Sequence, residues 1–149
     1  MWGLSVFIGT FCHNMDSKNR VTIPRKILDK VKKGKSRPVF YLNVGMDKCL
    51  FMFSESKWQE LADSLENLSL GTKESRDFQR LFFSDTHEVE VDGASRILIP
   101  DVLKEAACLK KEVIFLGAGT RIELWDKGRW QTRKQEIAGE YAKIAEDIF

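Results

Sequence analysis

Two short segments of the chain place an arginine four residues after an aspartate: Asp16 with Arg20, and Asp92 with Arg96. In a five-residue turn, the aspartate can accept hydrogen bonds from backbone N–H groups, or pair with the arginine and fix the direction of its guanidinium group. An isolated motif of this kind is usually an incidental surface pair. Here both motifs run into an Ile-Pro sequence, and they lie 92 − 16 = 76 residues apart. The repetition favours two rigidly presented arginines with a binding role.

Basic side chains are concentrated around the first motif. Residues 16–37 carry nine lysines and arginines against Asp16 and Asp29, a net charge of 9 − 2 = +7; the whole chain is +2, so the remainder sums to 2 − 7 = −5. The matching stretch 92–113 holds four basic and four acidic residues. This concentration indicates a polyanion-binding surface, and charge alone leaves open a solvated lysine-rich helix face. The nine residues are Lys18, Arg20, Arg25, Lys26, Lys30, Lys32, Lys33, Lys35 and Arg37.

Metal and catalytic chemistry have little support. His13, Asp16 and His87 could be imagined as metal ligands, but His87 aligns with Phe11, so the duplication does not repeat a ligand set. The Gly-Ala-Gly sequence at 117–119 precedes an alternating strand pattern, which indicates a hairpin turn and not a nucleotide-binding loop. The two histidines lie outside any recognisable catalytic motif. We therefore expect no enzyme activity, metal, cofactor or small-molecule substrate.

The size and composition fit one compact domain or a pair of half-domains. The 149 residues are 43% hydrophobic and 31% charged, with 24 basic against 22 acidic side chains, which excludes a large multidomain enzyme or a disordered tail. Three cysteines without a CxxC spacing favour reduced core thiols over disulfides or a zinc site. Residues 1–11 are apolar but lack a basic n-region and a cleavage site, and no later segment has the length of a membrane span. We expect a cytoplasmic protein.

Each copy of the repeat is expected to fold as β-turn-β-α-β-β. A second echo, at an offset of 117 − 45 = 72 residues, relates Gly45 and Trp58 to Gly117 and Trp130. Proline is tolerated at the first position of a helix, so the proline of each motif should start a short helix. The expected strands are 6–11, 21–23, 39–44 and 49–53, then 89–91, 97–99, 113–116 and 121–125. The expected apolar helix faces are Ile27, Leu28 and Val31, with Gly34 as a stop, and Val102, Leu103 and Ala106.

Further helices join and follow the two copies. Apolar side chains at spacings of three and four predict a core-facing helix, a second helix over about 72–83, and a long C-terminal helix. Their apolar positions are Trp58, Leu61, Leu65 and Leu68; Phe78, Leu81 and Phe82; and Trp130, Ile137, Tyr141, Ile144 and Ile148. The matched aromatic residues Phe53, Trp58, Trp125 and Trp130 favour packing in the core or between subunits. The resulting plan has a first unit at 7–54, a helical connector at 55–82, a second unit at 83–126 and a C-terminal helix at 127–149.

This combination of motifs resembles the MraZ family, a branch of the AbrB-like swapped-hairpin DNA-binding proteins. The resemblance covers nearly the whole chain from Phe7 to Trp130, and residues 1–6 look like an extension before the family's usual start. Any one piece is weak, but the order, spacing and duplication together are specific. The matching pieces are Gly9, His13, Asp16 to Lys18, Arg20, Ile23-Pro24, Gly45 to Phe53, Trp58, Phe78, Arg80, Asp92 to Pro100 and Arg121 to Trp125.

The resemblance implies an α+β, mainly β fold, with two tandem AbrB-like half-modules of the swapped-hairpin β-barrel type related by an approximate two-fold axis. It also implies a ring-shaped homo-oligomer that binds double-stranded DNA at the nucleoid, on short G-rich boxes upstream of the division and cell-wall gene cluster. The family's DNA-contacting arginine falls on Arg20, and the second copy places Arg96 there. An arginine fork can donate two hydrogen bonds to guanine. Lys18, Arg25 and Lys26 would hold phosphates, and Asp16 and Asp92 would fix the turns.

The chain departs from the family just before each arginine, where the family usually has glycine. This chain has Asn19 and Ser95. Asparagine enters the left-handed backbone region more readily than serine does. We therefore expect the second turn to differ in shape from the first, and Arg20 to be the main base-reading residue.

Two other classes of protein compete with this interpretation. The closer rival is an AbrB-like antitoxin or another partner-binding module, although such antitoxins typically have one AbrB-like copy and a disordered toxin-binding tail. Neighbouring cell-wall and division genes would favour the MraZ interpretation, and an adjacent toxin gene would favour the rival. A purely structural ring-forming protein is a third class, which an absence of salt-sensitive DNA binding would favour.

Overall fold

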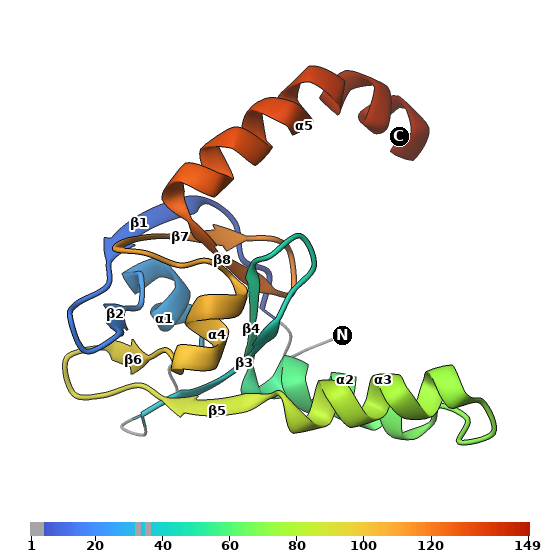
Figure 1. Ribbon diagram of the computed structural model, residues 1–149. Helices are drawn as coiled ribbons and strands as arrows, with labels where there is room; N and C mark the ends of the chain where they lie inside the picture. Colours follow the sequence, from blue (N-terminus) through green and yellow to red (C-terminus); the bar gives the residue numbers. More distant parts are fainter. Residues whose placement is uncertain (1–4, 32–33, 35–36) are drawn as a thin grey trace.

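The computed structural model describes residues 5–31, 34 and 37–149. The strands gather in one body, from which a pair of helices projects on one side and a long C-terminal helix on another (Figure 1). The first repeat forms β1 (Thr10–Asn14), β2 (Arg20–Thr22), α1 (Arg25–Val31), β3 (Val39–Val44) and β4 (Leu50–Ser54). The second forms β5 (His87–Glu90), β6 (Arg96–Leu98), α4 (Asp101–Ala106), β7 (Glu112–Gly117) and β8 (Ile122–Asp126). Helices α2 (Glu55–Glu66) and α3 (Lys73–Ser84) lie between the repeats, and α5 (Lys127–Ile148) follows the second.

A six-stranded antiparallel sheet interleaves the two repeats, and its strand order is β1-β7-β8-β4-β3-β5. Strand β1 of the first repeat pairs with β7 of the second, and β5 of the second pairs with β3 of the first. Neither repeat therefore has a sheet of its own. Strands β1 and β5 form opposite edges, so the sheet is open. The expected closed barrel is not found among the described residues.

Strand β1 begins later than the predicted strand 6–11. The chain first makes an isolated bridge between Phe7 and Gly119 and then turns at Gly9, whose φ is 95°. That left-handed backbone is accessible to glycine at little cost. Regular pairing with β7 starts only at Thr10, opposite Leu116.

One hydrophobic core is shared by both repeats. It joins the inner face of the sheet to α1, to α4 and to a separate two-stranded ribbon formed by β2 and β6. Val21 of β2 and Ile97 of β6 are 0% and 1% exposed. The ribbon is therefore anchored by the middle residue of each of its three-residue strands.

The two short helices begin one residue after the prolines of the motifs. The carbonyl of Pro24 accepts bonds from the N–H groups of Ile27 and Leu28, both at 3.0 Å, and the carbonyl of Pro100 does the same for α4. A cap residue in this role contributes its carbonyl, so the missing N–H of proline costs nothing.

One predicted helix face needs correction. Leu103 is buried as expected, but Val102 is 61% exposed, and Ala107 and Leu109 fill the core instead. The repeat offset explains this difference, since 107 − 76 = 31 and Ala107 takes the place of Val31. In the first repeat, Gly34 lies beyond α1 with a φ of 63°.

Helices α2 and α3 form an arm beside the sheet (Figure 1). The prediction that the α2 stripe faces the core is wrong, because α2 contains no buried residue and ends before Leu68. Its aromatic contacts are instead with β3 and α3: Trp58 stacks on Tyr41 at 5.1 Å and on Phe82 at 5.5 Å, measured between ring centroids. Trp58 thus joins α2 to both α3 and β3.

Helix α5 begins at Lys127, directly after β8, and projects from the sheet (Figure 1). At its base, Trp130 packs on Trp125 with 5.3 Å between centroids, and Arg129 lies over the Trp125 ring at 5.5 Å. Farther out, the predicted apolar stripe is exposed at Tyr141 (64%), Ile144 (43%) and Ile148 (73%). No helix in the described part of the chain has the length and apolarity needed to cross a membrane.

The cysteines are only partly as expected. All three are free thiols, but only Cys49 is buried, whereas Cys12 and Cys108 are exposed. Burial raises the pKa of the Cys49 thiol to about 12.

Gly117 provides a test of the interleaved architecture. A Cβ at this position would lie 2.4 Å from backbone atoms of Phe7 and Ile8. We expect Gly117→Ala to lower the free energy of unfolding by about 1–3 kcal/mol, as overpacking does. The control Gly139→Ala, in open space on α5, should instead raise it by about 0.5–1 kcal/mol. Urea denaturation followed by circular dichroism measures both, and an unchanged midpoint for Gly117→Ala would contradict the close approach.

Candidate nucleic-acid interface

The two Asp-to-Arg turns have the same hydrogen-bond pattern. In the first, Oδ1 of Asp16 accepts bonds from the backbone N–H groups of Lys18 and Arg20, both at 2.9 Å. Oδ2 of Asp16 accepts a bond from Nε of Arg20 at 2.8 Å. In the second turn, Asp92 binds the N–H groups of Ala94 and Arg96 at 2.9 and 2.8 Å, and Nε of Arg96 at 2.9 Å. Each aspartate thus fixes both its turn and its arginine.

The predicted difference in turn shape is wrong. The φ angles of Asn19 and Ser95 are 61° and 62°, so both residues adopt the same left-handed backbone. Each of these residues also offers its carbonyl to the other repeat: Ile23 N–H donates to Ser95 at 2.8 Å, and Ile99 N–H donates to Asn19 at 2.9 Å. These bonds, with the aspartate caps, hold serine in a conformation that it does not readily adopt alone.

The β2–β6 ribbon directs its arginines outward. Its register pairs Arg20 with Leu98, Val21 with Ile97, and Thr22 with Arg96. Alternate residues of a strand point to opposite faces, and Val21 and Ile97 point into the core. The outer face therefore carries Arg20, Thr22, Arg96 and Leu98.

Both guanidinium groups are fixed and still available. The side chains of Arg20 and Arg96 are 34% and 32% exposed. Each uses Nε for its aspartate, and within the described residues neither has a bond at Nη1 or Nη2. Two parallel N–H donors on a planar fork suit paired acceptors, such as two phosphate oxygens or O6 and N7 of guanine.

The same contacts lower the pKa of both turn carboxyl groups below the usual 3.8. For Asp16 the largest cause is the backbone hydrogen bond from Arg20; for Asp92 it is the corresponding bond from Arg96. The other turn N–H and the arginine side chain act in the same direction, and desolvation opposes them. The carboxylates are therefore ionised across the physiological pH range and keep the arginines in place.

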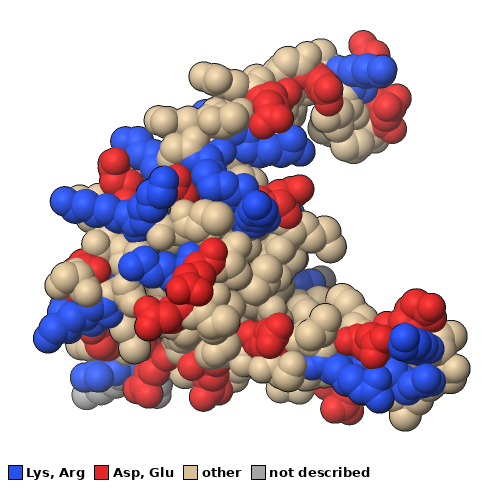
Figure 2. All heavy atoms as spheres, in the orientation of Figure 1, with Lys and Arg blue, Asp and Glu red and all other residues tan. Residues whose placement is uncertain are grey.

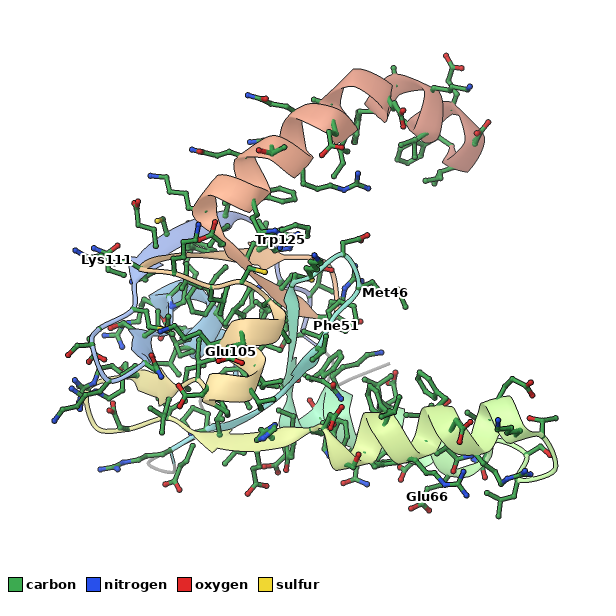
Figure 3. All side chains as sticks on the ribbon, viewed as in Figure 1. Met46, Phe51, Glu66, Glu105, Lys111 and Trp125 are labelled. Atoms are coloured by element: carbon green, nitrogen blue, oxygen red, sulfur yellow. The ribbon has the colours of Figure 1, made fainter. Side chains whose placement is uncertain are left out.

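The exchange of strands gives the first turn neighbours from the second repeat. The Asn19 side chain donates to Asp101 at 2.6 Å and accepts from Nζ of Lys104 at 2.9 Å. The carbonyl of Lys111 accepts a bond from Met15, directly before the turn, and Lys111 extends from the side of the body that carries the turns (Figure 3). Sequence proximity did not indicate these neighbours.

The second turn receives neighbours from the first repeat in return. The guanidinium of Arg37 lies over Gly93, with Nη2 3.4 Å from the position of a Cβ there. The bond from Ile23 to Ser95 also brings the start of α1 toward the second turn. Arg25, two residues after Ile23, is 74% exposed and has Asp29 at 3.9 Å. The excess charge of segment 16–37 is thus shared between the two turns and does not surround Arg20 alone.

The structure describes only some of the other predicted basic residues. Lys18 lies in the first turn and Lys26 in α1, and both are exposed. Lys32, Lys33 and Lys35 lie outside the described residues. Figure 2 shows lysine and arginine side chains over the edge that carries the turns and around the base of α5, with acidic side chains between them.

The metal-ligand candidates do not come together. His13 lies on β1, where its ring meets Phe115 edge-on at 6.1 Å, and His87 lies on β5 at the opposite edge of the sheet. Within the described residues, no group of three potential ligands could hold a metal ion. Residues 117–119 belong to the β7–β8 hairpin: Gly117 ends β7, and Ala118 N–H donates to the Arg121 carbonyl at 3.0 Å across the turn.

Comparison with known proteins agrees with the duplication. Residues 6–81 and residues 82–149 each match the same family, described as "MraZ protein, putative antitoxin-like". The chain belongs to the MraZ family. Three similar proteins are each named "Transcriptional regulator MraZ". They come from Finegoldia magna (38% identical, 96% of each chain), Heliobacterium modesticaldum (35%, 96% of each) and Alkaliphilus oremlandii (39%, 94% of each).

The predicted resemblance to MraZ is thereby confirmed, and each MraZ segment contains one aspartate-fixed turn. Sequence reasoning missed Thr22, Leu98, Arg37, Lys104 and Lys111 as neighbours of these turns. The buried positions of Val21 and Ile97 could have placed Thr22 and Leu98 on the outer face, through strand alternation. The other three depend on contacts between repeats.

Carboxyl titration by NMR tests the two turns separately. In Arg20→Ala the pKa of Asp16 should rise only part of the way to its usual value, because both backbone donors remain; Asp92 should not change. Arg96→Ala should show the reverse. Folding lowers both pKa values, so these carboxylates stabilise the fold above pH 3.8, and this contribution is lost as the pH falls through the lower folded-state values. Equal shifts of both carboxyls in either variant would contradict two independent turns.

Proposed function

We propose that this chain is a transcriptional regulator that binds double-stranded DNA through the outer face of the β2–β6 ribbon. The observation that carries the proposal is the pair of aspartate-fixed arginines, whose Nη groups bond to none of the described residues, presented on a ribbon whose other face is anchored in the core. A two-stranded ribbon fits the major groove. The names of the relatives support the regulatory role, and that role involves no catalysis.

Arg20 is the main base-reading residue in this proposal, through its Nη fork on guanine of G-rich boxes upstream of the division and cell-wall gene cluster. Lys18 lies two residues before Arg20, whereas Ala94 takes that place in the second turn. Arg96 reads a second position from a turn of the same shape. Lys18, Arg25 and Lys26 hold phosphates, which set affinity more than sequence. Such a protein acts at the nucleoid, in the cytoplasm.

The exchanged strands support an AbrB-like pairing of two units within one chain. We place the first unit at 7–54 and the second at 83–126, with the connector at 55–82 and the tail at 127–149. The register of β2 with β6 and the reciprocal bonds of Asn19 and Ser95 suit an approximate two-fold axis through the ribbon. The chain would thereby form by itself the swapped-hairpin pair of the AbrB-like proteins.

A ring-shaped homo-oligomer is the second part of the proposal. It is supported by the exposed apolar residues of α5 and by Phe78 (49%) and Leu81 (65%) on the arm. Apolar surface of this extent is typical of protein interfaces, and subunits that contact head to tail can close into a ring.

The DNA proposal is tested by a gel shift on the DNA upstream of the gene for this protein, with intact and scrambled boxes. Arg20→Ala should lose about 1–3 kcal/mol of discrimination, the contribution of a bidentate guanine contact, and should lose more than Arg96→Ala. Circular dichroism must show that both variants are folded.

The affinity of the unaltered protein should fall linearly with salt on logarithmic scales, because phosphate contacts release counterions. Equal losses in the two variants would contradict Arg20 as main reader and leave the ribbon as the interface. No binding to the upstream DNA at any salt concentration would overturn the proposal in favour of a partner-binding module.

The oligomer is tested by light scattering at micromolar concentration, which should give a mass several times 17.2 kDa. The double variant Tyr141→Asp, Ile144→Asp should lower this mass, because it places charges on the exposed stripe of α5. Lys143→Asp, on the other side of the same helix, is the matched control and should not. A monomeric unaltered protein would rule out the ring.

A further inference from the structure

The outer face of the ribbon carries an apolar side chain directly opposite Arg20. Leu98 pairs with Arg20 in the register and is 56% exposed. The matching residue of the first repeat is Thr22, since 98 − 76 = 22, and Thr22 pairs with Arg96. Each arginine is therefore paired with a residue of the other repeat: Arg20 with the apolar Leu98, and Arg96 with Thr22, which carries a hydroxyl group.

A second exposed apolar residue lies at the same end of the ribbon. Val102 is 61% exposed in the first turn of α4. The bond from Asn19 to Asp101 brings the start of α4 against the first turn. The matching residue of the first repeat is Lys26, since 102 − 76 = 26. Leu98 and Val102 thus place two apolar side chains near Arg20, where the matching positions near Arg96 carry Thr22 and Lys26.

We propose that Leu98, supported by Val102, contacts the C5-methyl group of a thymine next to the guanine bound by Arg20. This inference rests on the proposed function. The thymine methyl group lies in the major groove and is recognised by apolar contact. Directly paired residues of an antiparallel ribbon have Cβ atoms about 4.5–5.5 Å apart, which is comparable to the step of about 3.4 Å between bases of one strand. Arg20 and Leu98 therefore reach neighbouring bases.

The second turn offers a smaller apolar surface, the single methyl group of Thr22 in place of the Leu98 side chain. Thr22 can donate and accept a hydrogen bond, so it suits either type of base, and Arg37 over Gly93 suits a phosphate. The assignment gives Leu98 a specificity-determining role that the two arginines alone cannot supply, because the arginine forks both select guanine.

The experiment measures the affinity of synthetic duplexes that cover the protected segment of the upstream DNA. In each duplex one thymine is replaced by uracil, which removes only the methyl group. The unaltered protein should bind roughly fourfold more weakly at one such position, the effect of one buried methyl group. Leu98→Ser should bind the thymine and uracil forms equally. The control Leu70→Ser, at another exposed leucine (68%) between α2 and α3, should keep the preference for thymine.

The outcomes separate this inference from the proposed function. If the unaltered protein binds the boxes specifically but is indifferent to uracil at every position, or if Leu98→Ser keeps the preference, the role of Leu98 is wrong and the DNA proposal stands. If neither protein binds the upstream DNA, both fail. A lower oligomer mass for Leu98→Ser would assign Leu98 to a subunit contact and overturn the inference.

Discussion

The candidate interface depends on two backbone hydrogen bonds that cross between the repeats, from Ile23 to Ser95 and from Ile99 to Asn19. A ribbon of two three-residue strands has little stability of its own. These bonds extend it by one pair at each end and use the carbonyls of the two residues with left-handed backbone. Because Val21 and Ile97 anchor the ribbon in the shared core, the turns are fixed relative to the whole body and not only within themselves.

This arrangement explains why each turn can have an unfavourable backbone angle without glycine. A left-handed non-glycine residue costs of order 1–3 kcal/mol and persists only where its surroundings determine it. Here the aspartate accepts hydrogen bonds from two N–H groups of the turn, and a backbone N–H of the opposite repeat donates to the carbonyl of the left-handed residue. The conformation of each turn therefore depends on strand pairing between the repeats. A repeat folded alone would lose the cross-repeat hydrogen bond that stabilises its own turn.

Much of this could be predicted from the sequence, for identifiable reasons. The duplicated motifs gave the order of elements and the caps at Asp16 and Asp92, because turns and short helices are decided by nearby residues. The failures concern long-range contacts. Val102 fits an apolar helix face by spacing yet is exposed. The buried positions of α4 match those of α1, its counterpart in the first repeat, and not the local periodicity of the sequence. The α2 stripe has the spacing of a buried face, but α2 contains no buried residue, and its Trp58 packs on α3 and β3; periodicity does not say which partner covers a face. The roles of the arginines stay a prediction.

The distribution of charge along the sequence did not predict which charged residues lie beside which turn, because the strands of the two repeats interleave. In the sequence, Arg25 and Arg37 belong to the first motif, but the crossing brings the start of α1 and the guanidinium of Arg37 toward the second turn. In return, Asp101 and Lys104 of the neutral second stretch contact Asn19 beside Arg20. Two turns with the same backbone thus acquire different surroundings, one apolar with mixed charges and the other basic. In the proposed DNA complex, the two turns would therefore present different side chains to the DNA, and these side chains, not the backbone that the turns share, would set the orientation of the chain.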